Sequence, residues 1–171
     1  MFTPDKQVYN VLVADDSDDD RFLIKRAMQN APRLRLVAEV CNGDDVIAYL
    51  GGDREFMDRS RYPLPHLLLL DLKMPRKDGF EVLQWLQQKS RLDVTVVALT
   101  DSMEPAYLKR ALDLGADLFQ VKPRATHDRN AMILALEDRL VTTALKSTLQ
   151  HPKLRSKRPP SERQPASAAQ P

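Results

Sequence analysis

The sequence predicts an α/β fold: a doubly wound, parallel, five-stranded sheet with helices on both faces. Two observations predict it. Short apolar segments alternate five times with segments whose apolar residues recur at helical spacing. Four of the apolar segments end in an acidic, basic or hydroxyl residue that precedes a turn or a helix start. Parallel strands joined by right-handed helical crossovers have this order along the chain.

The first two elements are a strand at 8–14 and a helix that begins after Ser17. The strand is apolar and ends at two acids, Asp15 and Asp16. Ser17 and the three aspartates after it suit a helix start, because such residues cap free N–H groups and match the helix dipole. Apolar residues at helical spacing continue this helix to about Gln29.

The second pair is a strand at 34–40, which alternates in polarity, and a short helix at about 45–50. Residues 51–65 are polar and contain two glycines and two prolines. We expect a loop extension there, with a helical turn around 54–59. Cys41, the only cysteine, is expected to be a small buried hydrophobe.

The third strand, 66–71, is a short apolar run that ends at Asp71, and it is typical of a strand buried on both faces. A loop rich in turn residues and a helix at about 79–89 follow it. The remaining elements are strands at 93–100 and 117–122 and helices at about 105–114 and 128–145. Five such units favour a flavodoxin-like sheet with strand order 2-1-3-4-5.

The charge of the chain is divided unevenly. Residues 146–171 hold six basic residues and one acid, which leaves 20 basic and 23 acidic residues in 1–145. We therefore divide the chain into a folded domain, 1–146, and a basic, Pro/Ser/Ala-rich tail, 147–171, disordered from Thr148 onward. The N-terminus lacks the pattern of a signal peptide, and no apolar run is long enough to span a bilayer, so we expect a cytoplasmic protein.

Five polar residues stand at the ends of predicted strands 1, 3, 4 and 5: Asp15, Asp16, Asp71, Thr100 and Lys122. In a parallel sheet these ends meet at one edge. Three carboxylates packed together repel one another unless a cation is present, and Mg²⁺ prefers such oxygen ligands. Lysine and hydroxyl donors at the same edge suit phosphoryl oxygens, so the set predicts phosphoryl transfer with an aspartate as nucleophile.

Together, the motifs VLVADDS (11–17), LLLLDLKMPRKDG (67–79), VVALT (96–100) and LGADLFQVKP (114–123) resemble the receiver domain of two-component response regulators. The resemblance covers about residues 6–146. It implies that Asp71 accepts a phosphoryl group from a histidine kinase or a phosphotransfer protein. It also implies that Asp16, Asp71 and the backbone carbonyl of Lys73 ligate Mg²⁺, with Asp15 acting mainly through a bound water.

The resemblance assigns roles to three more residues. Thr100 would move toward the phosphoryl group, Lys122 would pair with it, and Phe119 would move inward as an aromatic switch, although a plain core role for Phe119 stays open. Two residues depart from the family pattern: Asp101 replaces a small residue, and Lys73 lies near the site, so the phosphoryl lifetime is open. The long 51–65 loop is similar to that of some single-domain regulators.

The expected function is signalling by protein–protein contact, with an unknown downstream protein and no DNA-binding output domain. A homodimer through the fourth helix, fifth strand and fifth helix is possible by analogy with the family. An aspartyl phosphatase needs a second acid two residues after the nucleophile, where Lys73 stands, so we do not expect an enzyme. The alternative is an adaptor or pseudo-receiver whose basic tail contacts nucleic acid or an acidic partner. Base-specific binding is not expected, because the tail lacks interleaved aromatics.

Overall fold

A five-stranded parallel sheet forms the centre of the molecule, with strand order β2-β1-β3-β4-β5. The computed structural model describes residues 7–89 and 92–150, of which 144–150 are described by their backbone alone. The strands are β1 (Tyr9–Ala14), β2 (Leu34–Val40), β3 (Leu67–Asp71), β4 (Thr95–Thr100) and β5 (Leu118–Val121). The predicted fold class and strand order are therefore confirmed.

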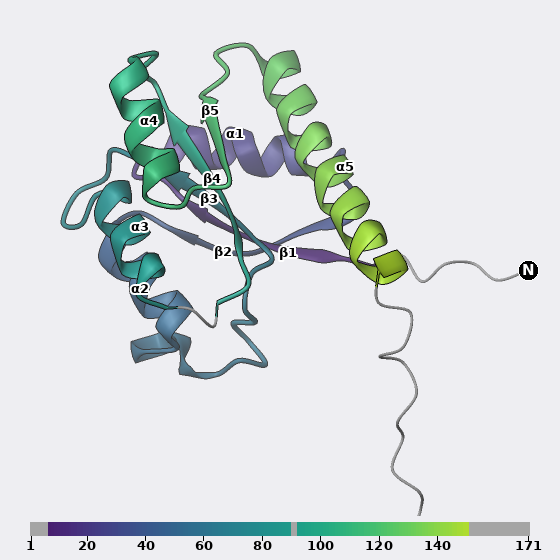
Figure 1. The fold of residues 1–171 in the computed structure, drawn as a ribbon, viewed down its shortest axis with the longest axis horizontal. Helices are drawn as coiled ribbons and strands as arrows, with labels where there is room; N and C mark the ends of the chain where they lie inside the picture. The colour runs from purple at the N-terminus through teal and green to yellow at the C-terminus, as the bar shows by residue number, and fades with distance from the viewer. Residues whose placement is uncertain (1–6, 90–91, 151–171) are drawn as a thin grey trace, which may run out of the picture.

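Within the described part of the chain, five α-helices connect and flank the strands (Figure 1). They are α1 (Asp18–Met28), α2 (Gly43–Gly51), α3 (Gly79–Gln87), α4 (Pro105–Asp113) and α5 (Thr126–Gln150), with a short 3₁₀ helix, η1 (Arg54–Met57), after α2. Helices α2, α3 and α4 lie along one face of the sheet, and α1 and α5 cover the other.

Alternation along the central strands divides the core into two layers. In β3, Leu68 and Leu70 face α2, α3 and α4, whereas Leu67 and Leu69 face α1 and α5. All four leucines are buried. Burial on both faces explains why this strand is a continuous apolar run rather than an alternating one.

The parallel register brings several strand ends to one edge of the sheet. Ala14 of β1 pairs with Leu70 of β3, and Asp71 pairs with Leu99 of β4. The residues that directly follow Ala14 and Leu70 are therefore neighbours at the carboxyl edge, where ligands bind in open α/β sheets. The sheet thus places the acids predicted from strands 1 and 3 side by side.

Side-chain contacts hold the loop before β3 against α2. Its buried Phe56 packs against Tyr49 of α2 and against Tyr62, with ring centres 5.1 and 5.2 Å apart. The guanidinium of Arg59 donates hydrogen bonds to the carbonyls of Tyr49 and Leu50, at 2.7 and 2.9 Å. The predicted helical turn is present as η1.

Two expectations are wrong. Cys41 is exposed, because it directly follows β2, the edge strand of the sheet. Helix α5 runs to Gln150, so residues 148–150, expected to be disordered, are helical. No glycine or proline interrupts the helix before Pro152. The rest of the predicted tail, 151–171, lies outside the described residues. Within the described ranges, no helix has both the length and the apolar character needed to cross a membrane.

Candidate functional site

Three predicted acids form one cluster at the carboxyl edge of the sheet. Asp15 and Asp16 follow β1, and Asp71 ends β3. One carboxylate oxygen from each lies within 4.8 Å of the others. Asp15 and Asp71 are buried and Asp16 is exposed, so the cluster is open to solvent on one side.

The Lys122 ammonium, just beyond β5, lies inside this cluster. Its Nζ is 2.8 Å from Asp15 Oδ2 and 2.9 Å from Asp71 Oδ2. A third carboxylate, that of Asp20 in α1, accepts a hydrogen bond from it at 3.0 Å. The lysine side chain is only 8% exposed, so these contacts form largely out of water and are weakly screened.

Hydrogen bonds from nearby backbone N–H groups hold the two buried carboxylates in place. Asp15 Oδ1 accepts a bond from the N–H of Ser17 at 3.0 Å, and Ser17 in turn caps α1. Asp71 Oδ1 accepts a bond from the N–H of Lys73, also at 3.0 Å. In each case the first carboxylate oxygen is held by the following turn, and Oδ2 points to Lys122.

Gly79, the first residue of α3, allows the chain to pass close to the cluster. A Cβ placed on Gly79 would lie 2.4 Å from the carbonyl oxygen of Asp71 and 2.8 Å from the Cα of Leu72. Both contacts are with backbone atoms, which cannot turn away as a side chain can. Asp78 and Glu81 begin the same helix with a capping box. The sequence around Gly79 therefore determines how α3 packs against the end of β3.

Burial dominates the electrostatics of the carboxylates. It raises the pKa of Asp71 above its ordinary value, although the N–H of Lys73 and the Lys122 ammonium act in the opposite direction. Burial likewise raises the pKa of Asp15, with Lys122 and the N–H of Ser17 opposing it. Burial alone would lower the pKa of the Lys122 ammonium, but the carboxylates of Asp15 and Asp71 raise it. Lys122 is thus a permanent cation that only partly compensates the acids.

The predicted switch residues occupy neighbouring strands. Thr100 ends β4 and is fully buried; its hydroxyl accepts a hydrogen bond from the N–H of Ser102 at 3.1 Å, and its carbonyl accepts one from the N–H of Lys122 at 2.7 Å. Phe119 in β5 is half-buried and packs against the core layer that faces α2, α3 and α4. Their switch roles stay predictions, as does the metal-binding role of the Lys73 carbonyl.

Both residues that depart from the family pattern are exposed. The Lys73 ammonium lies 5.9 Å from the ring centre of Tyr107 in α4. This contact turns the lysine toward α4, over a hollow of about 440 Å³ whose lining includes Asp16 and Lys73. Asp101 is exposed at the end of β4. The hollow adjoins the acid cluster through Asp16.

Sequence reasoning missed two charged residues of the site, Asp20 and Arg129. The sequence indicates Asp20 only as part of an acidic helix start. Arg129 in α5 is 6% exposed and lies near Asp20, with Nη2 3.5 Å from Asp20 Oδ1. A signal for Arg129 was present, because it precedes Met132 and Ile133 at the spacing of the buried face of α5.

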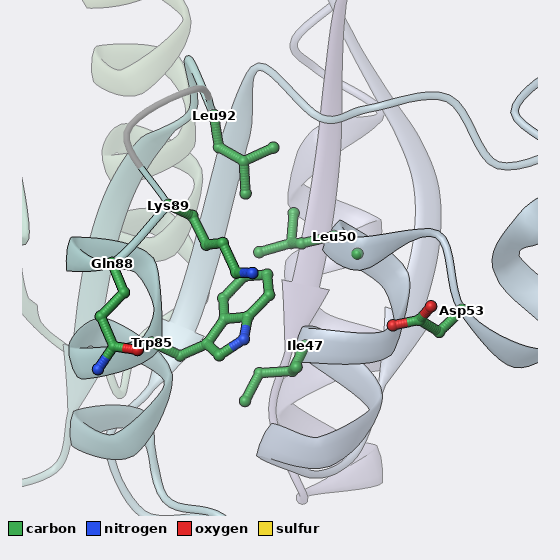
Figure 2. Close-up of a pocket in the computed structure, with 8 residues that line it drawn as sticks. Ile47, Leu50, Asp53, Trp85, Gln88, Lys89 and Leu92 are labelled. Carbon is green, nitrogen blue, oxygen red and sulfur yellow. The ribbon is translucent and has the colours of Figure 1, made fainter.

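A second hollow, of about 570 Å³, lies between α2 and α3, and none of the predicted site residues lines it. Figure 2 shows Ile47 and Leu50 of α2 facing Trp85 of α3 across it. The Lys89 ammonium lies 5.3 Å from the Trp85 ring centre. The two hollows are thus distinct in composition, and the acid cluster adjoins only the smaller one.

The residues present fit a hard divalent cation. The acid cluster supplies oxygen atoms from three carboxylates, the donor type that Mg²⁺ prefers. Asp15 Oδ2 is buried, and the cation beside it is the Lys122 ammonium, which Asp20 and Asp71 share. One ammonium cannot neutralise all of these carboxylates, so a further cation would offset the remaining charge. The geometry of the cluster is therefore consistent with a metal site.

Comparisons with known proteins agree with this arrangement. Residues 11–135 match the family profile described as response regulator receiver domain. The two-component response regulator ARR9 of Arabidopsis thaliana is 30% identical over 152 residues, which are 81% of this chain and 62% of that protein. The protein-glutamate methylesterase/protein-glutamine glutaminase 2 of Pseudomonas aeruginosa is 38% identical over 116 residues, 67% of this chain. The match covers only 30% of that enzyme, so this chain spans less than a third of its length.

Three solved structures are similar over most of their length. The phosphorylated cyanobacterial phytochrome response regulator RcpA is 28% identical, with a TM-score of 0.71 over 80% of this chain and 96% of that one. The regulator RPA3017, from red light signalling in R. palustris, is 32% identical, with a TM-score of 0.68 over 75% and 91%. The Mn²⁺-bound regulator Rcp1 is 28% identical, with a TM-score of 0.66 over 75% and 91%. This chain belongs to the response regulator receiver domain family.

Proposed function

We propose that this chain is a phosphorylatable response regulator that acts in the cytoplasm. In this proposal, Asp71 accepts a phosphoryl group from a histidine kinase or a phosphotransfer protein. One observation carries the proposal: Asp71 lies at a solvent-connected edge, 2.9 Å from the Lys122 ammonium and in a cluster with Asp15 and Asp16. A nucleophile, a fixed cation and a set of metal ligands are the parts that phosphoryl transfer to a carboxylate needs.

The proposed step is a simple displacement at phosphorus. A carboxylate oxygen of Asp71 forms a bond to phosphorus as the bond from phosphorus to the donor breaks, and the donor leaves with that electron pair. Asp15, Asp16 and Asp71 would hold Mg²⁺, together with the Lys73 carbonyl. The ion, when bound, supplies positive charge to the phosphoryl oxygens. Lys122 adds a second positive charge from the carboxyl end of β5, and Thr100 supplies a hydroxyl donor.

The consequence of phosphorylation would be a shift between two arrangements of the β4–α4–β5 region. Thr100 ends β4, the strand beside β3, and Phe119 lies in β5, the next strand, so both would respond to a new dianionic group on Asp71. Leu108 and Leu112 of α4 are 38% and 45% exposed. Exposed apolar side chains on this helix support the proposal that the face made by α4, β5 and α5 contacts a downstream protein or a second copy of the chain.

An enzymatic role toward other substrates is not part of the proposal. The similarity to methylesterases covers only 27–31% of those proteins, in the region of this chain that matches the receiver family. Within this region, Lys73 stands where an aspartyl phosphatase would need its acid, and its ammonium is turned toward Tyr107. Phosphoryl transfer to Asp71 and its later hydrolysis are the only chemistry assigned to the site.

The direct test is phosphorylation of the full chain by acetyl phosphate in the presence of Mg²⁺. We expect the wild-type protein to incorporate phosphate, and Asp71→Asn to incorporate none. Asp113→Asn is the matched control, since it removes an exposed acid of α4 outside the acid cluster and should leave labelling intact. Labelling of Asp71→Asn at the wild-type level would show that the phosphoryl acceptor lies elsewhere.

A further inference from the structure

Lys122 is held by one carboxylate more than the transfer chemistry requires. Besides Asp15 and Asp71, its ammonium donates to Asp20 Oδ2 at 3.0 Å. Asp20 belongs to the first turn of α1. It is not one of the three acids whose oxygens gather for a cation. Its contact with Lys122 therefore needs a separate explanation.

Asp20 bridges two cations. While Oδ2 accepts from Lys122, Oδ1 lies 3.5 Å from Nη2 of Arg129, whose side chain is 7% exposed. Among the described residues, Asp20 is the one carboxylate that forms an ion pair with Arg129. The same Nη2 donates a 2.6 Å hydrogen bond to the carbonyl of Pro123, the residue after Lys122. A buried arginine is costly unless paired in this way, so the arrangement constrains all three groups.

The bridge links three elements around the acceptor. Asp20 comes from α1, Lys122 and Pro123 from the end of β5, and Arg129 from α5. Asp20 and Arg129 carry opposite charges, so together they leave the net charge around Asp71 unchanged. What they change is the position of the Lys122 ammonium. The pair is thus suited to positioning and adds no net charge.

After phosphorylation of Asp71, Asp20 and the phosphoryl oxygens would compete for the Lys122 ammonium. Both oxygens of Asp71 are engaged, Oδ1 by the Lys73 N–H and Oδ2 by Lys122. When a phosphoryl group is bonded to one of them, the ammonium must turn toward the phosphoryl oxygens to neutralise them. Asp20 holds the same ammonium and opposes this movement. Arg129 takes up part of the Asp20 charge and so weakens the opposition.

We propose that Asp20 and Arg129 are positioning residues that set how readily Lys122 reaches the phosphoryl group on Asp71: Asp20 competes for the ammonium, and Arg129 limits the competition. This inference rests on the proposed phosphorylation of Asp71. It differs from a purely structural role in one respect. If Arg129 acts through Asp20, loss of Arg129 is harmful only while Asp20 is charged.

A double-mutant cycle on the full chain tests this dependence. The rate constant of phosphorylation by acetyl phosphate is measured at saturating Mg²⁺ for the wild type, Asp20→Asn, Arg129→Gln and the double variant. We expect Arg129→Gln to be about three- to tenfold slower than the wild type, a size typical of residues in one ionic network. Asp20→Asn should equal or exceed the wild-type rate, and the double variant should lie within about twofold of Asp20→Asn.

Matched controls separate this effect from loss of charge or loss of fold. Arg124→Gln and Asp19→Asn remove an exposed charge one residue beyond Pro123 and one residue before Asp20, and should leave the rate within about twofold. Arg129→Lys keeps a cation beside Asp20 and should restore most of the rate lost in Arg129→Gln. If Arg129→Gln does not fold, Arg129→Met, which keeps an unbranched side chain but removes the charge, replaces it in the cycle and is likewise expected to recover its rate in the Asp20→Asn background.

The two possible failures are distinguishable. If the wild type is not labelled, the proposed function and this inference are both wrong. If the wild type is labelled but Arg129→Gln is as fast as the wild type, or is equally slow with and without Asp20, the inference alone is overturned. Recovery of the rate on removal of Asp20 is the result that structural damage at Arg129 would not give.

Discussion

The Asp71 carboxylate lies 2.9 Å from the ammonium of Lys122, which is 51 residues further along the chain. The contact joins the ends of β3 and β5, strands that are separated in the sheet by β4. The single positive charge of Lys122 does not neutralise the negative charge at this edge, because Asp15 and Asp20 share the same lysine. The excess of negative charge has consequences for stability that can be measured.

Asp71→Asn should stabilise the metal-free protein at neutral pH. Burial holds the pKa of Asp71 above its ordinary value of 3.8, so the ionised carboxylate opposes folding. This destabilisation is absent below the unfolded-state pKa and grows as the pH rises through the folded-state pKa. We expect a higher Tm for Asp71→Asn at pH 7.5 without divalent ions, by about 3 °C for each kcal/mol relieved.

Thermal unfolding followed by circular dichroism measures this difference, with Asp101→Asn as an exposed control. The gain should shrink as the pH is lowered toward 4, where the wild-type carboxyl is protonated as well. A lower Tm for Asp71→Asn at pH 7.5 would mean that the Lys122 contact outweighs burial at this site.

Mg²⁺ affinity should fall as the pH is lowered, and this fall should occur over a higher pH range than the pKa of an ordinary aspartate would give. The metal requires ionised carboxylates, and burial raises the pKa values of both Asp15 and Asp71. Binding at mildly acidic pH should therefore release protons. Titration calorimetry in two buffers of different ionisation enthalpy counts those protons between pH 5 and 8. An affinity that is constant over this range, with no proton release, would contradict the assigned electrostatics.

The parts of the fold that depend on local pattern were predictable from sequence. β3 is a continuous apolar run, and the alternation of strand and helix determines the topology, so the edge that holds Asp15, Asp71 and Lys122 could be predicted. These residues directly follow or end their strands. A short offset from a strong strand signal leaves little freedom in where a side chain lies.

Contacts between distant helices were not predictable in the same way. Asp20 and Arg129 meet because α1 and α5 pack on the same face of the sheet, and no local pattern specifies which residues of two helices touch. The exposure of Cys41 was likewise not predictable from the local pattern. Its exposure depends on β2 being an edge strand, which follows from the assembled sheet and not from the residues around position 41.

Gly79→Ala should damage both stability and phosphorylation. The added methyl group would lie 2.4 Å from the Asp71 carbonyl oxygen, so α3 or the end of β3 must move. Overpacking of this kind costs about 1–3 kcal/mol. Gly51→Ala is the matched control: there the methyl group would meet only the side-chain oxygen of Asp53, which can rotate away. Urea unfolding and the acetyl phosphate assay measure the two effects, and equal behaviour of the two variants would contradict the packing argument.

Tyr49→Phe should loosen the loop before β3. The Tyr49 hydroxyl donates a 2.9 Å hydrogen bond to the Pro63 carbonyl, and its loss should cost about 1–2 kcal/mol. Burial also raises the pKa of Tyr49 from 10.0 to about 12. The protonated phenol is thus favoured in the folded state, and this contribution is complete below pH 10 and lost as the pH rises toward 12. By linkage it amounts to roughly 2–3 kcal/mol.

The alkaline prediction is checked by following the phenolate absorbance of the folded protein and the pH dependence of unfolding. Relative to the wild type, Tyr49→Phe should lose stability less steeply above pH 10. Tyr62→Phe is the control, since its ring belongs to the same aromatic cluster. A Tyr49 phenol that ionises at its ordinary pKa of 10 in the folded chain would overturn this account of the loop.

The central claim is that Asp71 forms an acyl phosphate, and chemical trapping tests it most directly. Borohydride reduces an aspartyl phosphate to homoserine, so tandem mass spectrometry of the reduced protein identifies the modified residue. After incubation with acetyl phosphate and Mg²⁺, we predict homoserine at position 71 alone, and none when Mg²⁺ is chelated. Homoserine at Asp15 or Asp16, or phosphate that resists borohydride because it is carried by a hydroxyl group, would contradict the account.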